Sequence, residues 1–227
     1  MSTPPSRLIR QFDTHRLIPS RYSPASDSVL ARIADNDADL RDIFDLDHAT
    51  NDRLLAENDL LPGIGLGELV IGVPNYRVIN AAFCHAHPLG SRFNGPERGA
   101  WYAGFEIETA IAEIGFHKQV ELAEVAWAKP VRLTYDDYLA DFTGLFHDIR
   151  DSDEFAPCLD RESYVVSQGL ARRLLEEMSL GVVYPSVRKP GGTCIVCFRP
   201  AVVGNVRKDQ RWSFTFEAGA QPQVNSG

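Results

Sequence analysis

The sequence predicts an α+β protein with a small twisted mixed β-sheet and flanking helices. Three observations lead to this expectation. Apolar residues make up 44% and charged residues 24% of the 227 residues, which is ordinary for a folded globular chain. From about residue 67 onward, several short strand-like segments occur with only a few helical ones. Their order is too irregular for a repeated strand–helix–strand unit, which disfavours an α/β fold.

Residues 1–66 are expected to form a mostly helical extension. Apolar residues in the segment 26–45 recur at the spacing of short amphipathic helices, and Ser26 or Ser28 can serve as the N-cap. The glycine-rich stretch LPGIGLG follows. It precedes the strand-like ELVIG, whereas a dinucleotide-binding glycine loop follows its strand, so it predicts a turn at a domain boundary.

The main domain is expected over residues 67–218, followed by a flexible tail at 219–227. Its acidic segment 147–162 indicates a surface insertion. Such an insertion either covers a substrate pocket, contacts a partner protein or mediates the formation of oligomers. The periodicity predicts strands at 76–83, 100–104, 120–128, 131–137, 181–186, 192–198, 201–206 and 212–217, and helices at 105–117, 138–149 and 160–178.

The formal net charge of -8 disfavours a protein that wraps the phosphate backbone of nucleic acid. No apolar stretch is long enough to predict a membrane span, and the first residues, MSTPPSRLIRQFDTHR, lack the apolar centre of a signal peptide. We therefore expect a cytoplasmic protein that binds neither nucleic acid nor membrane directly.

The cysteines and histidines do not predict a metal site. Cys84, Cys158 and the pair in TCIVCF are expected to be reduced core residues in a chain of this size. A strand would place Cys194 and Cys197 on opposite faces, and no second pair of ligands follows. His85 and His87 share one face but have no third ligand at a suitable spacing.

The helix predicted at 105–117 carries the most informative carboxylate. With about 100° per residue, it has an apolar stripe and an adjacent stripe that contains polar residues. The first consists of Ile107, Ile111 and Ile114, and the second of Glu106, Ala110, Glu113 and His117. Glu113 therefore borders the core, with space beside Ala110, although taken alone it would be interpreted as a solvated surface residue. His117 either contacts Glu113 or is a satisfied helix-end histidine.

Two arginines and a serine stand at positions that allow both a structural and a functional interpretation. Arg77 and Arg92 lie in or beside apolar segments, where an arginine pairs with a carboxylate or a phosphate. A structural salt bridge is the simpler interpretation of each. Ser186 follows the strand that ends at Pro185, so its hydroxyl either stabilises a turn or points into a cleft.

Taken together, these residues resemble a known family. Arg77 in a predicted strand is followed by Arg92 in the turn GSRFN, and Tyr102 ends a short strand before the helix ETAIAE. Ser186 then closes a strand as YPSVR. This order resembles the RES domain, named for its Arg, Glu and Ser, which forms the toxin half of type II toxin–antitoxin pairs with Xre-type antitoxins.

The resemblance implies a fold similar to that of ADP-ribosyltransferases and NAD as the substrate, with neither a cofactor nor a metal. Carried over residue by residue, it implies that Glu113, Arg77 and Ser186 are catalytic. Arg77, Arg92, Tyr102 and Ser186 would bind NAD. The partner it implies is a cognate helix-turn-helix antitoxin of the Xre type, and the chain alone leaves open whether it forms a homo-oligomer or a hetero-oligomer with the antitoxin.

These residue types suit the chemistry of NAD. Two arginines can bind its pyrophosphate by charge-assisted hydrogen bonds, and Tyr102 can stack on a ring. Breaking the nicotinamide–ribose bond creates an oxocarbenium-like centre, which a fixed carboxylate such as Glu113 can stabilise. Ser186 can hydrogen-bond the ribose or the carboxamide. Nicotinamide leaves as a neutral base, so no second acid is needed.

Three functions are compatible with the sequence. The first is a toxin that consumes NAD by hydrolysis or phosphorolysis and arrests growth. The second is a mono-ADP-ribosyltransferase that modifies a cellular protein, and the third is a non-catalytic module that only binds a partner. The sequence does not decide between NAD and NADP.

Overall fold

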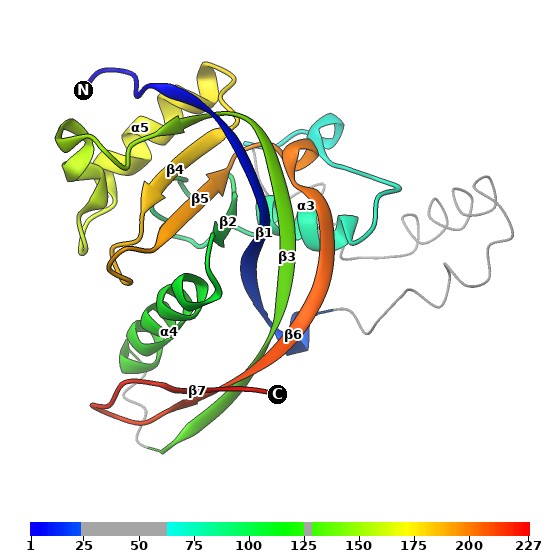
Figure 1. Ribbon diagram of the computed structural model, residues 1–227, viewed down its shortest axis with the longest axis vertical. Helices are drawn as coiled ribbons and strands as arrows, with labels where there is room; N and C mark the ends of the chain where they lie inside the picture. The colour runs from blue at the N-terminus through cyan, green and yellow to red at the C-terminus, as the bar shows by residue number, and fades with distance from the viewer. Residues whose placement is uncertain (24–62, 125–128) are drawn as a thin grey trace, which may run out of the picture.

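The computed structural model describes residues 1–23, 63–124 and 129–227. The described chain is α+β, as predicted, with a seven-stranded mixed sheet and three α-helices (Figure 1). The helices are α3 (Tyr76–Cys84), α4 (Ile107–Glu124) and α5 (Val165–Glu176). The strands are β1 (Ser6–Pro19), β2 (Trp101–Gly104), β3 (Val131–Asp148), β4 (Gly181–Pro185), β5 (Thr193–Cys197), β6 (Gly204–Phe216) and β7 (Gln223–Ser226). Short 3-10 helices are η1 (Ser20–Tyr22), η3 (Leu66–Glu68), η4 (Asp153–Leu159) and η5 (Pro200–Val202).

Five of the strands pair in a closed circuit, which runs β1-β2-β5-β4-β3 and returns to β1. The sheet order is β1-β2-β5-β4-β3-β6-β7, and β1 pairs with β3 in addition. The antiparallel β1–β3 ladder is long, whereas His15 opposite Gly104 is the one registered pair between β1 and β2. Among the described strands, β3 and β4 are the one pair that runs in parallel, through His147 and Asp148 of β3. Figure 1 shows the long strands β1, β3 and β6 side by side, curving together as a three-stranded ribbon, with the short strands β2, β4 and β5 to one side.

Alternation along the strands sends side chains into different hydrophobic clusters. Val183 and Ile195 face the circuit's interior with Trp101, whereas Val182 and Val196 face α5. α4 packs against the β1–β3–β6 ribbon through a third cluster that includes Leu17, Ala110, Tyr135, Phe214 and Phe216. The predicted apolar stripe of this helix, Ile107, Ile111 and Ile114, packs against that third cluster.

β1 corrects the prediction that residues 1–66 form a mostly helical extension. Residues 6–19 are a strand of the central sheet, with Ile9 and Leu17 buried and an irregular register between Gln11 and Thr14. Strand pairing with a segment more than a hundred residues away stabilises β1, and a local pattern search does not detect such a partner. The helices predicted at 26–45 lie outside the described residues.

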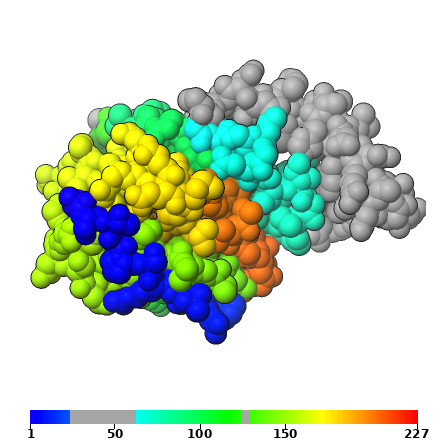
Figure 2. Space-filling model, turned by 90° about the horizontal axis from the view of Figure 1, so that it is seen from above, coloured from blue at the N-terminus to red at the C-terminus, as the bar shows by residue number. Residues whose placement is uncertain are grey.

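The residues before β1 are also fixed to the main body. The Arg173 guanidinium donates to the carbonyls of Met1 (2.9 Å) and Ser2 (3.2 Å), and the backbone N–H of Ser2 donates to Glu154 (2.7 Å). The N–H of Asp148 donates to the carbonyl of Pro5. Figure 2 shows this N-terminal segment, in blue, lying across the surface beside the yellow residues of α5.

α3 corrects the strand predicted at 76–83. Its β-branched and aromatic residues resemble a strand, but Val78, Ile79 and Phe83 pack into the interior cluster at helical spacing. Asn75 stands before the helix in the left-handed region (φ 58°), and its side-chain amide donates to the carbonyl of Val206 (2.8 Å). The buried Asn80 side chain bonds both backbone groups of Val70.

β3 corrects the helix predicted at 138–149. Residues 131–148 form one strand, because β1 covers one edge while β6 and then β4 cover the other. Residues 135–138 are all buried, and the register shifts against β6 after residues 136 and 139. Because this part of the strand is buried on both faces, its sequence lacks the alternation of apolar and polar residues by which a half-buried strand is recognised.

Three further segments differ from their predictions. Residues 120–124 continue α4 rather than starting a strand, and the rest of the predicted strand lies outside the described residues. The expected tail contains β7, which pairs with β6. The acidic segment 147–162 contains η4, whose Phe155 and Cys158 are buried in the cluster beneath α5. Most of its other residues after β3 are exposed, so the segment lies on the surface and is anchored to the core by these two side chains.

All four cysteines are buried, as predicted for core residues. Within the described chain they form no disulfide. Among the helices that the structure describes, none combines the length and the apolar character needed to cross a bilayer.

Gly181 starts β4 in a conformation that favours glycine. Its φ is 148°, and a Cβ at this position would collide with the carbonyl oxygen of Val196 on β5. β4 carries the chain from there to Ser186. The start of this strand therefore depends on a residue without a side chain.

We predict that Gly181→Ala lowers the free energy of unfolding by about 2–4 kcal/mol, because strain at φ and the collision with Val196 add together. Gly169→Ala in α5 is the matched control. No atom lies within 4 Å of a Cβ built there, so this substitution should stabilise the protein by about 1 kcal/mol. Urea denaturation measures both values. A stability of Gly181→Ala equal to that of the parent protein would contradict the prediction.

Candidate active site

The start of α4 is fixed to β2 and β5 by close packing and by one carboxylate. A Cβ on Gly104 would lie 2.8 Å from the N atom of Ala110, so this turn requires glycine. The Glu106 carboxylate accepts hydrogen bonds from the Thr109 hydroxyl (2.6 Å) and from the backbone N–H of Thr193 (3.1 Å). These contacts determine where the following turns of α4 lie relative to the β4–β5 hairpin.

Glu113 and Ser186 meet where α4 passes the turn between β4 and β5. The Ser186 hydroxyl donates to Oε1 of Glu113 at 2.6 Å. Oγ of Ser186 in turn accepts the backbone N–H groups of Arg188 (3.1 Å) and Lys189 (2.9 Å). Because these two donors occupy its lone pairs, the hydroxyl proton is directed at Glu113. The structure thus brings together two of the predicted site residues, from distant parts of the sequence.

Two buried groups lie beside this carboxylate. The Cys194 thiol lies 3.8 Å from Oε1 of Glu113, and burial, then the charge of Glu113, raises the pKa of that thiol far above its usual value. Burial likewise raises the pKa of Tyr184, with further contributions from Cys194 and Glu113. Both groups therefore stay protonated near neutral pH. The Glu113 side chain remains 23% exposed, so a ligand can reach it.

Tyr102 fixes a loop with its hydroxyl. The hydroxyl accepts the backbone N–H of Phe93 (2.9 Å) and donates to Oδ1 of Asn94 (2.7 Å). Burial raises the pKa of Tyr102, so the phenol remains neutral. Tyr102 thus holds the loop that contains Arg92 against β2.

Arg92 is buried and binds main-chain carbonyls. Its Nη1 donates to the carbonyls of Cys158 (3.0 Å) and Asp160 (2.6 Å), and its guanidinium lies 4.7 Å from the ring centre of Tyr164. No carboxylate pairs with it within the described residues, so the structural salt bridge weighed from sequence is absent there. Its positive charge lowers the pKa of Tyr184 as a minor contribution.

Arg77 is not in a strand, which corrects the basis of its assignment. It belongs to α3, where its Nε donates to the Tyr76 hydroxyl at 3.2 Å. α3 packs into the cluster that contains Tyr138, whereas α4 packs into the cluster that contains Tyr135. These clusters lie on opposite faces of the β1–β3 pair. The NAD-binding and catalytic roles implied for Arg77 therefore remain predictions.

Arg16 is a residue that the sequence reasoning missed. It lies on β1, donates from Nη1 to the carbonyl of Tyr102 (3.0 Å) and stands 4.9 Å above the ring centre of Trp101. Burial lowers the pKa of Arg16 to about 10. An arginine in the apolar stretch THRLIP was a usable signal. It was overlooked because residues 1–66 were treated as a separate extension.

His117 lies beside the second carboxylate oxygen of Glu113. Its Nε2 is 3.9 Å from Oε2 of Glu113. Burial lowers the pKa of His117; the charge of Glu113 opposes this shift, and Arg188, Arg92 and His87 add to it. The His117 ring is therefore neutral at pH 7. Oε2 of Glu113 thus lies beside a neutral ring, and no residue of the described ranges donates a hydrogen bond to it.

Two comparisons with known proteins extend this description. The family model of the RES domain matches residues 70–217, which is more than half of the chain. A solved structure of the M.tuberculosis MbcT-MbcA toxin-antitoxin complex is similar, with 14% sequence identity and a TM-score of 0.42. The match covers 57% of this chain and 73% of that chain. No curated protein matches the sequence.

We predict that Ser186→Ala lowers the free energy of unfolding by about 2 kcal/mol, because two backbone N–H groups and one carboxylate oxygen lose their partner. Ser186→Thr keeps the hydroxyl and should recover most of this loss. Ser163→Ala is the control, since Ser163 is exposed and its hydroxyl accepts one long hydrogen bond (3.5 Å). Urea denaturation of the three variants is the measurement, and equal losses for Ser186→Ala and Ser163→Ala would refute the prediction.

Proposed function

The chain belongs to the RES-domain family, and from this premise we propose that it is the toxin of a toxin–antitoxin pair that cleaves the nicotinamide–ribose bond of NAD. One observation carries the proposal. Glu113 is a partly exposed carboxylate held at 2.6 Å by Ser186, with the His117 ring 3.9 Å from its second oxygen. A fixed, accessible negative charge suits a substrate that develops positive charge on its ribose.

The two oxygens of Glu113 have different tasks in this mechanism. Oε1 accepts the Ser186 hydroxyl and lies beside the Cys194 thiol, so it is held in place. Oε2 lies 3.9 Å from Nε2 of the exposed His117, and it stabilises the positive charge that develops at the ribose, or accepts a ribose hydroxyl. Because the carboxylate is oriented before the substrate binds, little reorganisation is needed during cleavage.

The bond cleavage needs no general acid. The C–N bond breaks with its electron pair moving to the ring nitrogen of nicotinamide, which leaves as a neutral molecule. Water then forms the new C–O bond and releases a proton, giving ADP-ribose. Phosphate in place of water would give a phosphorylated ADP-ribose, and a protein side chain would give an ADP-ribosylated protein.

A partner follows from the family resemblance. A toxin of this kind needs an antitoxin that blocks it until growth is to be arrested, and we propose a helix-turn-helix protein of the Xre type encoded beside it. Consumption of NAD would take place in the cytoplasm. Co-purification of the chain with the product of the neighbouring gene, and loss of NAD cleavage on binding, would support this pairing.

We predict that the purified protein releases nicotinamide from NAD and that Glu113→Gln slows the release by about 10²–10³-fold, because Gln keeps the shape but removes the charge. Glu108→Gln on the exposed side of the same helix is the control and should keep the parent rate. NAD labelled in its adenylate half identifies the acceptor. Free labelled ADP-ribose supports hydrolysis, a phosphorylated product supports phosphorolysis, and label on a protein band supports the transferase.

A different result would show that the chain is not an enzyme acting on NAD. If Glu113→Gln and the parent protein arrest growth equally and neither consumes NAD, the chain acts only by binding a partner. Circular dichroism of the variant excludes unfolding as the cause of any loss, since Ser186 can still donate to the Gln carbonyl.

We predict that cleavage slows as the pH falls below about 6.5, the ordinary pKa of histidine. Burial keeps the pKa of His117 below that value, so the imidazolium forms only on the acid side, where it would pair with Glu113 and reduce its charge. In His117→Gln the acid limb of the pH–rate profile should move to lower pH. His147→Gln, which alters a histidine at the end of β3, should keep the parent profile, and an unmoved limb in His117→Gln would disprove the role.

A further inference from the structure

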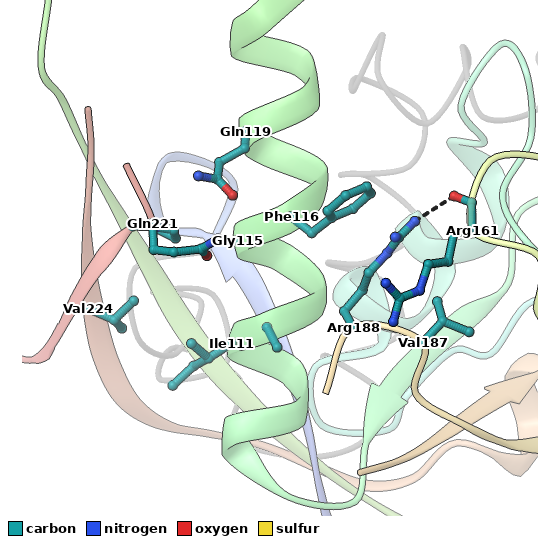
Figure 3. Close-up of a pocket in the computed structure, with 11 residues that line it drawn as sticks. Ile111, Gly115, Phe116, Gln119, Arg161, Val187, Arg188, Gln221 and Val224 are labelled. Atoms are coloured by element: carbon teal, nitrogen blue, oxygen red, sulfur yellow. Dashed lines mark hydrogen bonds between the residues drawn. The ribbon is translucent and has the colours of Figure 1, made fainter. Parts of the chain in front are cut away.

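Two arginines from different parts of the chain bind neighbouring carbonyls of one segment, residues 158–164, which connects η4 to α5. The carbonyl of Asp160 accepts a hydrogen bond from Nη1 of Arg92 (2.6 Å), and the carbonyl of Arg161 accepts one from Nη2 of Arg188 (2.7 Å). Figure 3 shows the second of these bonds. Arg92 lies in the loop between α3 and β2, whereas Arg188 follows β4. The 158–164 segment therefore joins these two regions.

The 158–164 segment is held in one shape by its own side chains. Oδ1 of Asp160 accepts the backbone N–H groups of Glu162 (2.7 Å) and Ser163 (2.9 Å), which closes a turn just before α5. At the other end of the segment, the Cys158 side chain is buried in the cluster beneath α5. The carbonyls that bind Arg92 are therefore fixed in place before any substrate arrives.

The Arg92 guanidinium is bound along one edge and open along the other. Nη1 donates to the carbonyls of Cys158 and Asp160, and the half-buried ring of Tyr164 lies 4.7 Å from the guanidinium, within the range of a cation–π contact. Nε and Nη2 donate to no residue in 1–23, 63–124 or 129–227, and neither atom is fully buried. Their N–H groups form a planar fork that suits two oxygens of a phosphate.

Direct contacts connect this guanidinium to the candidate active site. The ring of Phe93, the residue after Arg92, packs against the ring of Tyr184 with 4.8 Å between their centres. Tyr184 lies opposite Cys194 in the β4–β5 pair, and the Cys194 thiol is 3.8 Å from Oε1 of Glu113. The loop of Arg92 and the Glu113 carboxylate therefore belong to one packed region, and the 158–164 segment forms its edge.

We propose that the 158–164 segment is a wall of the substrate site and that Tyr164 is a positioning residue, which holds the Arg92 guanidinium so that its open edge binds a phosphate of the dinucleotide. This inference rests on the proposed function. Tyr164 lies outside the set of residues predicted from the sequence. Of the roles considered for the acidic segment, the inference selects the first, which is to cover a substrate pocket.

Removal of the Tyr164 ring tests this role. Nicotinamide riboside is the probe, because it carries the scissile bond but no phosphate. In Tyr164→Leu we expect the ratio of kcat/KM for NAD to kcat/KM for the riboside to fall about tenfold, mainly through KM for NAD, the loss of one well-placed charge-assisted contact. Tyr164→Phe keeps the ring and should keep the parent ratio. Tyr22→Leu is the control, since exposed Tyr22 also stacks on an arginine, Arg21, at 4.6 Å.

A double-mutant cycle separates positioning from a general structural effect. Arg92→Ala should lower the same ratio, and adding Tyr164→Leu to it should lower the ratio no further. If Tyr164→Leu slows cleavage of NAD and of the riboside equally, or lowers the ratio as much without Arg92 as with it, the inference is wrong and the proposed function stands.

Binding of inorganic pyrophosphate, measured by isothermal titration calorimetry, decides the inference where the parent protein does not cleave the riboside. Binding that weakens about tenfold in Tyr164→Leu and not in Tyr22→Leu supports the inference. Equal binding by the two variants, or no binding by the parent protein, overturns it. If the parent protein cleaves neither NAD nor the riboside, the proposed function fails, and the same binding measurement still decides whether Tyr164 positions Arg92 for a phosphate.

Discussion

The hydrogen bond from Ser186 to Glu113 joins two parts of the molecule that have separate cores. α4 packs against the long strands in one hydrophobic cluster, while β4 and β5 contribute to the other two. Side chains of Glu113 and Ser186 meet at the boundary. A small shift of α4 against the β4–β5 hairpin would separate them, so Glu106 and Gly104, which fix the start of the helix, matter for the site as much as its own residues.

Strand pairing provides the frame on which this alignment depends. β1 pairs with β3 along most of its length and touches β2 at one residue pair, which closes the circuit of five strands. The same strand brings Arg16 to the carbonyl of Tyr102. Tyr102 in turn holds the loop that contains Arg92. The strand nearest the N-terminus therefore helps to position residues that follow it by some eighty positions.

Local patterns predicted the segments whose neighbours impose one simple periodicity. The α4 stripe of Ile107, Ile111 and Ile114 was predicted correctly because these residues recur at helical spacing. The strands around Tyr102 and Ser186 were predicted correctly because each is a short apolar run that ends at a turn or a helix start. β3 and α3 were not. Their residues are buried on several sides, and the partners that decide between helix and strand are distant in sequence.

The sequence by itself determined the α+β class and the family, because residue types in a fixed order carry that information. For the same reason it predicted that the Glu113 carboxylate and the Ser186 hydroxyl belong to one site. Tertiary structure alone decided that β1 belongs to the sheet, that Arg16 approaches Tyr102, and that Arg77 lies on a helix across the sheet from α4. Contacts between distant segments arise from packing of whole elements. The free energy of these contacts comes from burying apolar surface between elements that are distant in sequence, and a local stretch of residues does not contain that information.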